Sequence, residues 1–230
     1  MEPDWLTEAV LNNAHWCDAV AASHGLEGRW AASVWSSNQP MPRFYPNIIT
    51  LTPDAPVAQT IDALKADLPS GWGIKDSFAA LKLAQSGFTL AFDAHWYCCL
   101  PDELRQTSTD PELRVDGVRT EVEFDRWVSA WGEGEGIFRF QLLENEAVEL
   151  IYAEREGQIE AGLAANVSGS SVGISNAFGA ASAIQACIAA VAARNSTKAV
   201  VGYGGDAELA SLATLGFRAI GDLRIWLCAD

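Results

Sequence analysis

The feature that most constrains this chain is an internal repeat, because segments of its two halves match at one constant offset. The stretch Leu83–Phe88 recurs 129 positions later as Leu212–Phe217, and both copies end in Gly-Phe. The same offset carries Glu27-Gly28 onto Glu156-Gly157, and no gap is needed between these matches. Further pairs are Asn47 with Asn176, Ala63 with Ala192, Gly73 with Gly202, Asp93 with Asp222, and Cys99 with Cys228. A fixed period of this kind indicates a duplicated structural unit.

Both copies show the same order of elements. In the second, an apolar helical stripe at spacings of three and four residues (Ile184, Cys187, Ile188, Val191) follows two strands. We then expect a short helix between Asp206, a residue type that caps helix N-termini, and Gly216, a glycine of the kind that ends helices. The expected strands are 158–167, 172–178, 198–203 and 217–228, the last with a bulge at Gly221.

The first copy repeats the order with strands at 30–36, 47–51, 72–75 and 88–99. Asp54 and Asp76 are the expected helix caps, and Gly87 closes the second helix. Amphipathic helices at 5–22 and 121–131 precede the two copies. The fold class is therefore mixed α/β, built from two ββαβαβ units of which the first is incomplete. We expect units at 1–100 and 119–230, joined by a polar linker at 101–118.

Charge excludes two classes of partner. The 230 residues carry 30 acidic and 15 basic side chains, a net charge of −15, and no basic run. Binding to a phosphate backbone or to an anionic membrane surface needs clustered Lys and Arg, so we expect neither partner. The uncharged segment 161–193 is long enough to span a bilayer, but the polar stretch Asn166–Ser171 interrupts it. We interpret it as two buried strands and a small-residue helix.

The five cysteines form no CxxC pair, and only three histidines accompany them. This pattern predicts neither a disulfide framework nor a metal site. The first residues show no basic region followed by an apolar run, so we expect no signal peptide and a cytoplasmic protein.

Residues 120–228 resemble the GNAT superfamily of acyl-CoA N-acyltransferases. The resemblance rests on the strand pair within 160–178, the helix that ends in Leu212–Phe217, and the final strand. Val172–Phe178 is similar to a divergent bacterial branch, and residues 1–100 resemble a shorter copy. The resemblance implies that two strands splay apart around the pantetheine arm of acetyl-CoA, and that the pyrophosphate sits on the next helix N-terminus. The implied cofactor-binding residues are Ile174, Ser175, Asn176, Phe178, Gly179, Ala180, Ala181 and Ser182. Alternatively, these small residues only pack a helix against the sheet.

The chain departs from the family pattern in two places. Many members place a tyrosine, the acid for the leaving thiolate, five residues before the Phe of Gly-Phe, where this chain has Leu212 and, in the first copy, Leu83. The loop before the helix lacks a basic residue. Tyr203, at the carboxyl end of its strand, is a candidate substitute acid, and Glu160 is a candidate base. Each residue also has a purely structural interpretation. Tyr203 is then a half-buried tyrosine without a chemical role, and Glu160 is a carboxylate that faces solvent.

Trp127 and Trp131, at helical spacing, and Asp206 are candidate acceptor-binding residues, with core packing and helix capping as the alternatives. The resemblance implies acetyl transfer from acetyl-CoA to a small-molecule or protein amine by direct attack. A non-catalytic module that binds a ligand or a protein is the rival function. An open cleft at 174–182 favours the enzyme, and a cleft filled by Phe178 favours the module.

Overall fold

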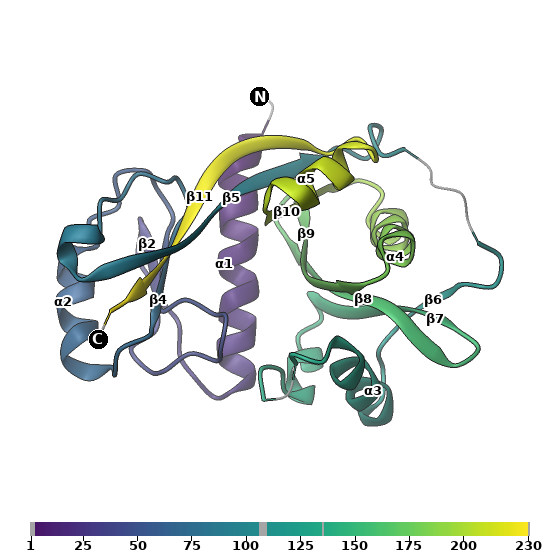
Figure 1. Ribbon diagram of the computed structural model, residues 1–230, viewed down its shortest axis with the longest axis horizontal. Coiled ribbons are helices and arrows are strands. Elements are labelled where there is room, and N and C mark those ends of the chain that lie inside the picture. Colours follow the sequence, from purple (N-terminus) through teal and green to yellow (C-terminus); the bar gives the residue numbers. More distant parts are fainter. Residues whose placement is uncertain (1–2, 106–109, 135, 230) are drawn as a thin grey trace.

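The strands of the chain join one mixed sheet (Figure 1). The computed structural model describes residues 3–105, 110–134 and 136–229. The strands are β1 (Arg29–Trp30), β2 (Val34–Ser36), β3 (Ile48–Thr50), β4 (Gly73–Asp76), β5 (Phe88–Cys99), β6 (Arg114–Gly117), β7 (Val148–Arg155), β8 (Gln158–Ser168), β9 (Ser171–Gly179), β10 (Ala199–Gly204) and β11 (Arg218–Cys228). Their order in the sheet is β1-β2-β3-β4-β11-β5-β10-β9-β8-β7-β6.

The two halves of the sheet exchange their last strands. β5, from the first half of the chain, pairs with β10, with His95 opposite Gly204. β11, from the second half, pairs with β4, with Arg224 opposite Asp76. β5 and β11 lie antiparallel to each other in the middle, where they bridge the halves (Figure 1). One sheet thus contains both predicted units, and the division at 101–118 stays a prediction, although β6 lies within that range.

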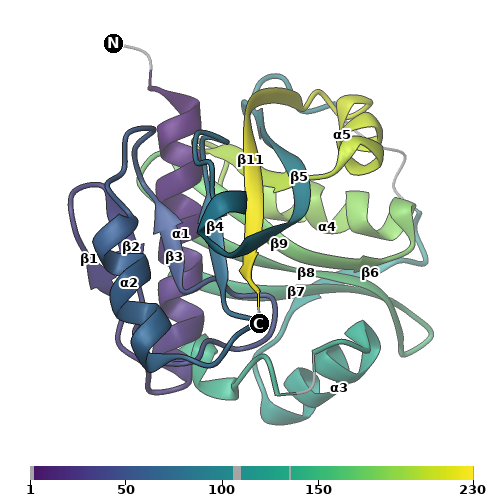
Figure 2. The same cartoon turned by 60° about the vertical axis from the view of Figure 1, so that its left-hand side comes forward.

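Helices cover both faces of the sheet (Figure 2). They are α1 (Trp5–Ser23), α2 (Ala58–Asp67), α3 (Glu121–Trp131), α4 (Ala181–Arg194) and α5 (Asp206–Ala213). Side chains alternate along a strand, so Trp96 belongs to the core cluster that includes residues of α1 and α3, whereas its neighbour Tyr97 belongs to the cluster that includes residues of α4 and α5. A separate cluster joins α2 to β3 and β4. The sheet is therefore the middle layer of three.

The helix α1 lies across the junction of the two halves. The Asp4 carboxylate caps it by accepting from the Leu6 and Thr7 amides. Asn12 donates to the carbonyl of Asn166 at 2.9 Å, and Asn166 donates to the carbonyl of Asn12 at 3.1 Å. Both asparagines are buried, so this reciprocal pair fixes α1 on β8.

Most of the expected elements are confirmed, including the helix at 121–131, the strands and helix within 161–193, and the bulge at Gly221. The helix expected to start at Asp76 is wrong. The Asp76 carboxylate instead accepts from the Ala80 and Leu81 amides, and Ala79 has a φ of 51°, which a helix cannot contain. Only a 3-10 turn, η1 (Ala84–Ser86), forms there; a second, η2 (Phe140–Glu144), precedes β7. Nor does Asp54 cap α2, whose N-cap is Val57.

His95 ties the exchanged strands together and predicts a pH dependence of stability. Its ring nitrogens contact Asp222 on β11 at 2.7 Å and Asp206 on α5 at 2.9 Å. The hydrogen bond to Asp222, and then that to Asp206, raise the pKa of His95. Protonated His95 therefore stabilises the fold fully below the unfolded pKa of about 6.5, and this contribution is lost as pH rises through the higher folded pKa.

We expect His95→Gln to lower the unfolding free energy more at about pH 5.5 than at about pH 9, because glutamine does not titrate. Urea unfolding of both proteins at the two pH values measures this. An equal loss at both pH values would show that protonation of His95 adds nothing to stability.

The asparagine pair gives a second prediction. Asn12→Ala leaves the buried Asn166 carbonyl without its donor, so the free energy of unfolding should fall by about 1–3 kcal/mol. Ala22→Ser, an exposed change on the same helix, should stay within about 0.5 kcal/mol of the original protein. Equal losses in the two variants, measured by urea unfolding, would contradict the role assigned to Asn12.

Candidate functional site

A cleft opens where β9 and β10 diverge. Their parallel pairing ends at Gly173 and Val201, although β9 continues to Gly179 and β10 to Gly204. A bulge in β9 accompanies the divergence: the register to β8 shifts between Gly162 and Ala164, and Asn176 has a φ of 53°. A non-glycine residue in this region stores strain, which is typical of functional sites. The cleft has a volume of about 460 Å³, within the roughly 300–1,000 Å³ of small-molecule pockets.

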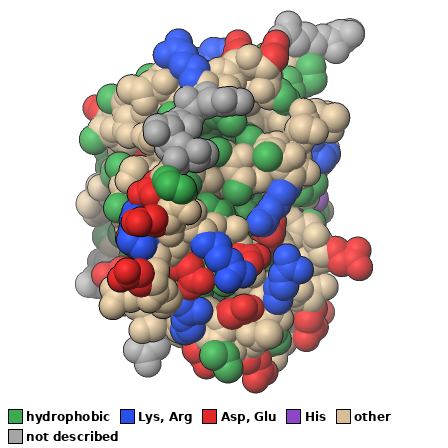
Figure 3. Space-filling model, turned by 90° about the vertical axis from the view of Figure 1, so that its right-hand side faces the viewer, with side chains coloured by type: hydrophobic (Ala, Val, Ile, Leu, Met, Phe, Trp, Pro, Cys, Tyr) green, Lys and Arg blue, Asp and Glu red, His purple; other side chains and the backbone are tan. Residues whose placement is uncertain are grey.

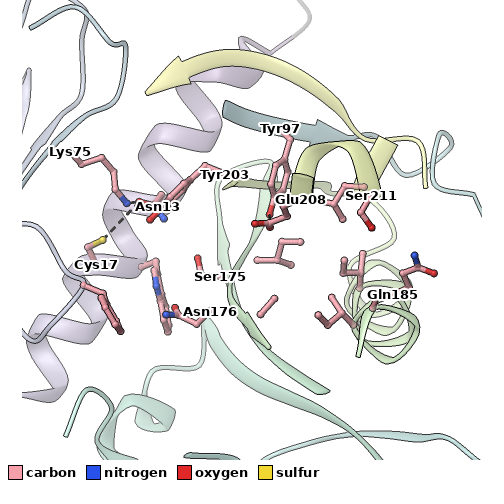
Figure 4. Close-up of a pocket in the computed structure, with 18 of the residues that line it drawn as sticks. Asn13, Cys17, Lys75, Tyr97, Ser175, Asn176, Gln185, Tyr203, Glu208 and Ser211 are labelled. Carbon is pink, nitrogen blue, oxygen red and sulfur yellow. Dashed lines mark hydrogen bonds between the residues drawn. The ribbon is translucent and has the colours of Figure 1, made fainter. Parts of the chain in front are cut away.

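Both halves of the chain line this cleft (Figure 4). Gln185 and Ser211 lie at the end beside α4 and α5, whereas Asn13, Cys17 and Lys75 lie at the opposite end. The remaining lining residues are Trp16, Phe44, Tyr45, Tyr97, Ile174, Ser175, Asn176, Ala177, Ala181, Ile184, Ile188, Tyr203, Glu208 and Leu212.

Phe178 does not fill the cleft. Its ring packs edge-on against Trp127, with centroids 5.0 Å apart, in the core on the α3 side of the sheet. Residues within 174–182 therefore border an open space that Phe178 does not occupy.

The residues implied for acetyl-CoA fall into two groups. Ile174, Ser175, Asn176 and Ala181 line the cleft, whereas Phe178, Gly179, Ala180 and Ser182 are not among its lining residues. Gly179 has a φ of 100°, and a Cβ there would lie 2.0 Å from the Glu160 carbonyl, so glycine is required where β9 turns into α4. Ala180 is the N-cap of α4 and makes no side-chain capping bond.

Tyr203 occupies a central position. It lies at the end of β10, half-buried, with its ring edge-on to Trp96 at 5.3 Å between centroids. The Lys75 ammonium lies over its ring, 4.3 Å from the centroid. Tyr203 lines the cleft and also a second cavity, so it stands between the two spaces.

The other predicted site residues lie outside both cavities. Glu160 is ion-paired with Arg155 at 2.7 Å. On the face shown in Figure 3, acidic and basic side chains are interspersed. Asp206 is the first residue of α5, after the N-cap Gly205, and bonds to His95. Trp127 is fully buried and donates to the Ile151 carbonyl, and Trp131 stacks on Phe138. Their predicted roles stay predictions.

Sequence reasoning missed a tyrosine and a carboxylate that face the cleft side by side (Figure 4). The Tyr97 hydroxyl donates to Glu208 Oε1 at 3.1 Å. Burial, and then the Glu208 charge, raise the pKa of Tyr97 well above its usual value, so the hydroxyl keeps its proton. Loss of water raises the pKa of Glu208, and the bond from Tyr97 offsets part of that rise. A cleft carboxyl with a raised pKa is a candidate acid or base.

The second cavity, of about 660 Å³, is mainly apolar. Phe44, Tyr45 and Tyr203 line it and the cleft, so the two spaces adjoin. Tyr45 donates to Asn176 Oδ1 at 3.0 Å, which ties the loop before β3 to the bulge of β9. The remaining lining residues are Pro40, Met41, Pro42, Arg43, Pro46, Asn47, Leu68, Pro69, Ser70, Gly71, Trp72, Gly73, Ala91, Phe92, Ile225 and Leu227.

Solved structures show which fold this is. A GCN5-related N-acetyltransferase from Kribbella flavida superposes with a TM-score of 0.65 at 11% sequence identity, over 94% of this chain and 95% of that chain. A putative acetyltransferase from the GNAT family of Novosphingobium aromaticivorans gives 0.57 at 13% identity, over 96% and 98%. A GCN5-related N-acetyltransferase from Sphaerobacter thermophilus gives 0.57 at 9% identity, over 97% and 94%.

The chain therefore has the mixed α/β fold of the GNAT superfamily, as its sequence predicted. No protein-family model matches the sequence, and no curated protein matches it. The duplication and the bacterial branch stay predictions. Across the described residues, no helix is sufficiently long and apolar for a bilayer span, and no group of three or more His, Cys, Asp or Glu side chains is arranged to hold a metal ion.

Proposed function

We propose that this protein is an N-acyltransferase that passes an acyl group, in the first instance acetyl from acetyl-CoA, directly to an amine. The observation that carries the proposal is the open cleft between the diverging ends of β9 and β10. The amine belongs to a small molecule or a protein. A cytoplasmic location is part of the proposal, supported by five cysteines that are all free thiols.

The residues at the cleft fit an acyl-CoA. Where β9 and β10 part, the facing strand edges no longer pair with each other, so their backbone groups can bond to the amides of a pantetheine arm. The amino end of α4 adjoins this space through Ala181. The small side chains Ala180, Ala181 and Ser182 leave its first N–H groups accessible, and a helix N-terminus favours phosphate.

The chemistry assigned to the cleft needs a base and an acid. A bound acyl-CoA supplies a thioester carbonyl that an amine nitrogen can attack. Glu208 accepts the proton that the amine loses as its bond to the carbonyl carbon forms. Tyr203 donates a proton to the departing thiolate as the carbon–sulfur bond breaks. Glu208 is better placed for its role than Glu160, whose carboxylate is engaged with Arg155 outside the cavities.

The acceptor enters from the second cavity in this proposal. That space adjoins the cleft at Tyr203, and its walls include Trp72 and Phe92. An amine that lies there meets the thioester beside the tyrosine hydroxyl. Trp127 and Trp131, the sequence-based candidates for this pocket, line neither cavity: Trp127 is a core residue, and Trp131 packs against the same core.

A non-catalytic binding module is the second candidate, and one observation favours it. Leu212 lines the cleft at the position where many GNAT enzymes carry their tyrosine acid. The lining also offers a single cation, Lys75, at the end far from α4 (Figure 4), so no basic side chain there assists phosphate binding.

Binding of acetyl-CoA tests the proposal. Isothermal titration should give a micromolar dissociation constant, and Ala181→Trp should weaken it by at least about tenfold, because the indole would occupy the cleft. Ala189→Trp, an exposed change on the same helix outside the lining, should bind as the original protein does. No binding at millimolar acetyl-CoA would leave the non-catalytic module as the better account.

Kinetics test the assigned roles once an acceptor is found. Glu208→Gln and Tyr203→Phe should each lower kcat by about 10²–10⁴-fold, the usual contribution of a general base or acid. Because the pKa of Glu208 is raised, the original enzyme should gain activity with rising pH through that pKa, and Glu208→Gln should lose this limb. A larger effect from Glu160→Gln would return the base to that residue.

A further inference from the structure

A buried lysine at the inner end of the cleft has no part in the mechanism above. Lys75, on β4, is only 2% exposed and lines the cleft. Its ammonium donates to Asn13 Oδ1 and lies over the face of the Tyr203 ring. In the repeat, Lys75–Phe78 corresponds to the region of Tyr203, and the sequence left two interpretations open there: a remnant site, or a charged strand end and cap.

The carboxylates near Lys75 are engaged elsewhere. Asp76, its chain neighbour, accepts from the Ala80 and Leu81 amides. Asp18 accepts from the indole nitrogens of Trp30 and Trp35. Glu208, the acid within the cleft, accepts from Tyr97. No ion pair to Lys75 occurs between residues 3–105, 110–134 and 136–229.

The other groups around the ammonium are uncharged. Asn13 offers one amide oxygen, and Tyr203 offers a ring face. Burial raises the pKa of the Cys17 thiol, and although Lys75 lowers it in part, the net rise keeps the sulfur protonated. An ammonium has three donors and needs an anion when it is buried, since an uncompensated buried charge is costly. The cleft therefore presents an unneutralised cation to whatever occupies it.

We propose that Lys75 binds a carboxylate of the substrate. The substrate class is then an amine that also carries a carboxylate, such as an amino acid, or an acyl-CoA whose acyl chain ends in one. The inference rests on the proposed function, because it assigns the anion to a substrate of the same cleft. Asn13, on α1, fixes the ammonium, and Tyr203 places it at the junction of the two cavities.

The apolar second cavity favours the acceptor as the source of the carboxylate. An amino acid with an apolar side chain would place that side chain against Trp72 and Phe92 and its carboxylate at Lys75. Phenylalanine, phenylalaninamide and phenethylamine are matched probes, because they share the ring and the amine and differ in the carboxylate alone.

Isothermal titration of the three probes, with and without CoA, tests the acceptor source. Phenylalanine should bind about 10- to 100-fold more tightly than the other two, as expected for a charge-assisted hydrogen bond. Succinyl-CoA against acetyl-CoA, titrated into the protein alone, tests the acyl source in the same way. Tighter binding of phenylalanine would assign the carboxylate to the acceptor, and tighter binding of succinyl-CoA would assign it to the acyl donor. Equal binding within both series overturns the proposal.

Lys75→Met should abolish the preference for the ligand that carries the carboxylate. Lys82→Met, which alters an exposed lysine outside both cavities, should keep the preference. Thermal unfolding of each variant reports whether it folds, and the comparison of ligands on the original protein stands without any variant. A preference that survives Lys75→Met overturns the assignment. Failure of acetyl-CoA to bind, with the phenylalanine preference intact, would instead reject the acyltransferase and keep the carboxylate site.

Discussion

The antiparallel pairing of β5 with β11 is the interaction on which the rest of the structure depends. These two strands join the halves of the sheet, because β5 pairs with β10 of the second half and β11 pairs with β4 of the first half. The candidate site follows from this exchange. Tyr97 lines the cleft because β5 lies beside β10. Lys75 lines it because β11 pairs with β4 and so joins β4 to β5 and β10 in the same sheet. Neither half alone contains the cleft together with Glu208 and Lys75.

Charge is distributed unequally between the surface and the site. The acidic excess lies largely outside the cavities, where arginines such as Arg155 neutralise part of it in exposed pairs that contribute little to stability. Inside the cleft, one carboxyl with a raised pKa and one cation lie at different positions along the same space. A long, mostly apolar space with a few separated polar groups suits a substrate that is oriented at more than one point.

Local patterns predicted the elements well, and long-range pairing limited the prediction of the site. The stripe of α4 and the spacing of α3 are visible in the sequence because a helix needs only its own residues. The rule that ligands bind at strand ends singled out Tyr203, and the family resemblance singled out Asn176; both residues line the cleft. The sequence cannot distinguish β5 from β11 as the neighbour of β10, because the repeat makes them alike. Tyr97 and Glu208 were missed for that reason, and the error at Asp76 arose because Ala79 takes a conformation that periodicity does not reveal.

The strand exchange also bears on how the chain acquires its structure during synthesis. The ribosome releases β4 long before β11. The edge of β4 that pairs with β11 therefore stays unpaired until nearly all of the remaining chain has been synthesised. Until then β5 can pair only with segments already made, and contacts this distant in sequence form slowly. An exposed strand edge is a template for pairing with other chains. The nascent first half is thus the stage at which this protein is most exposed to aggregation and most dependent on chaperones.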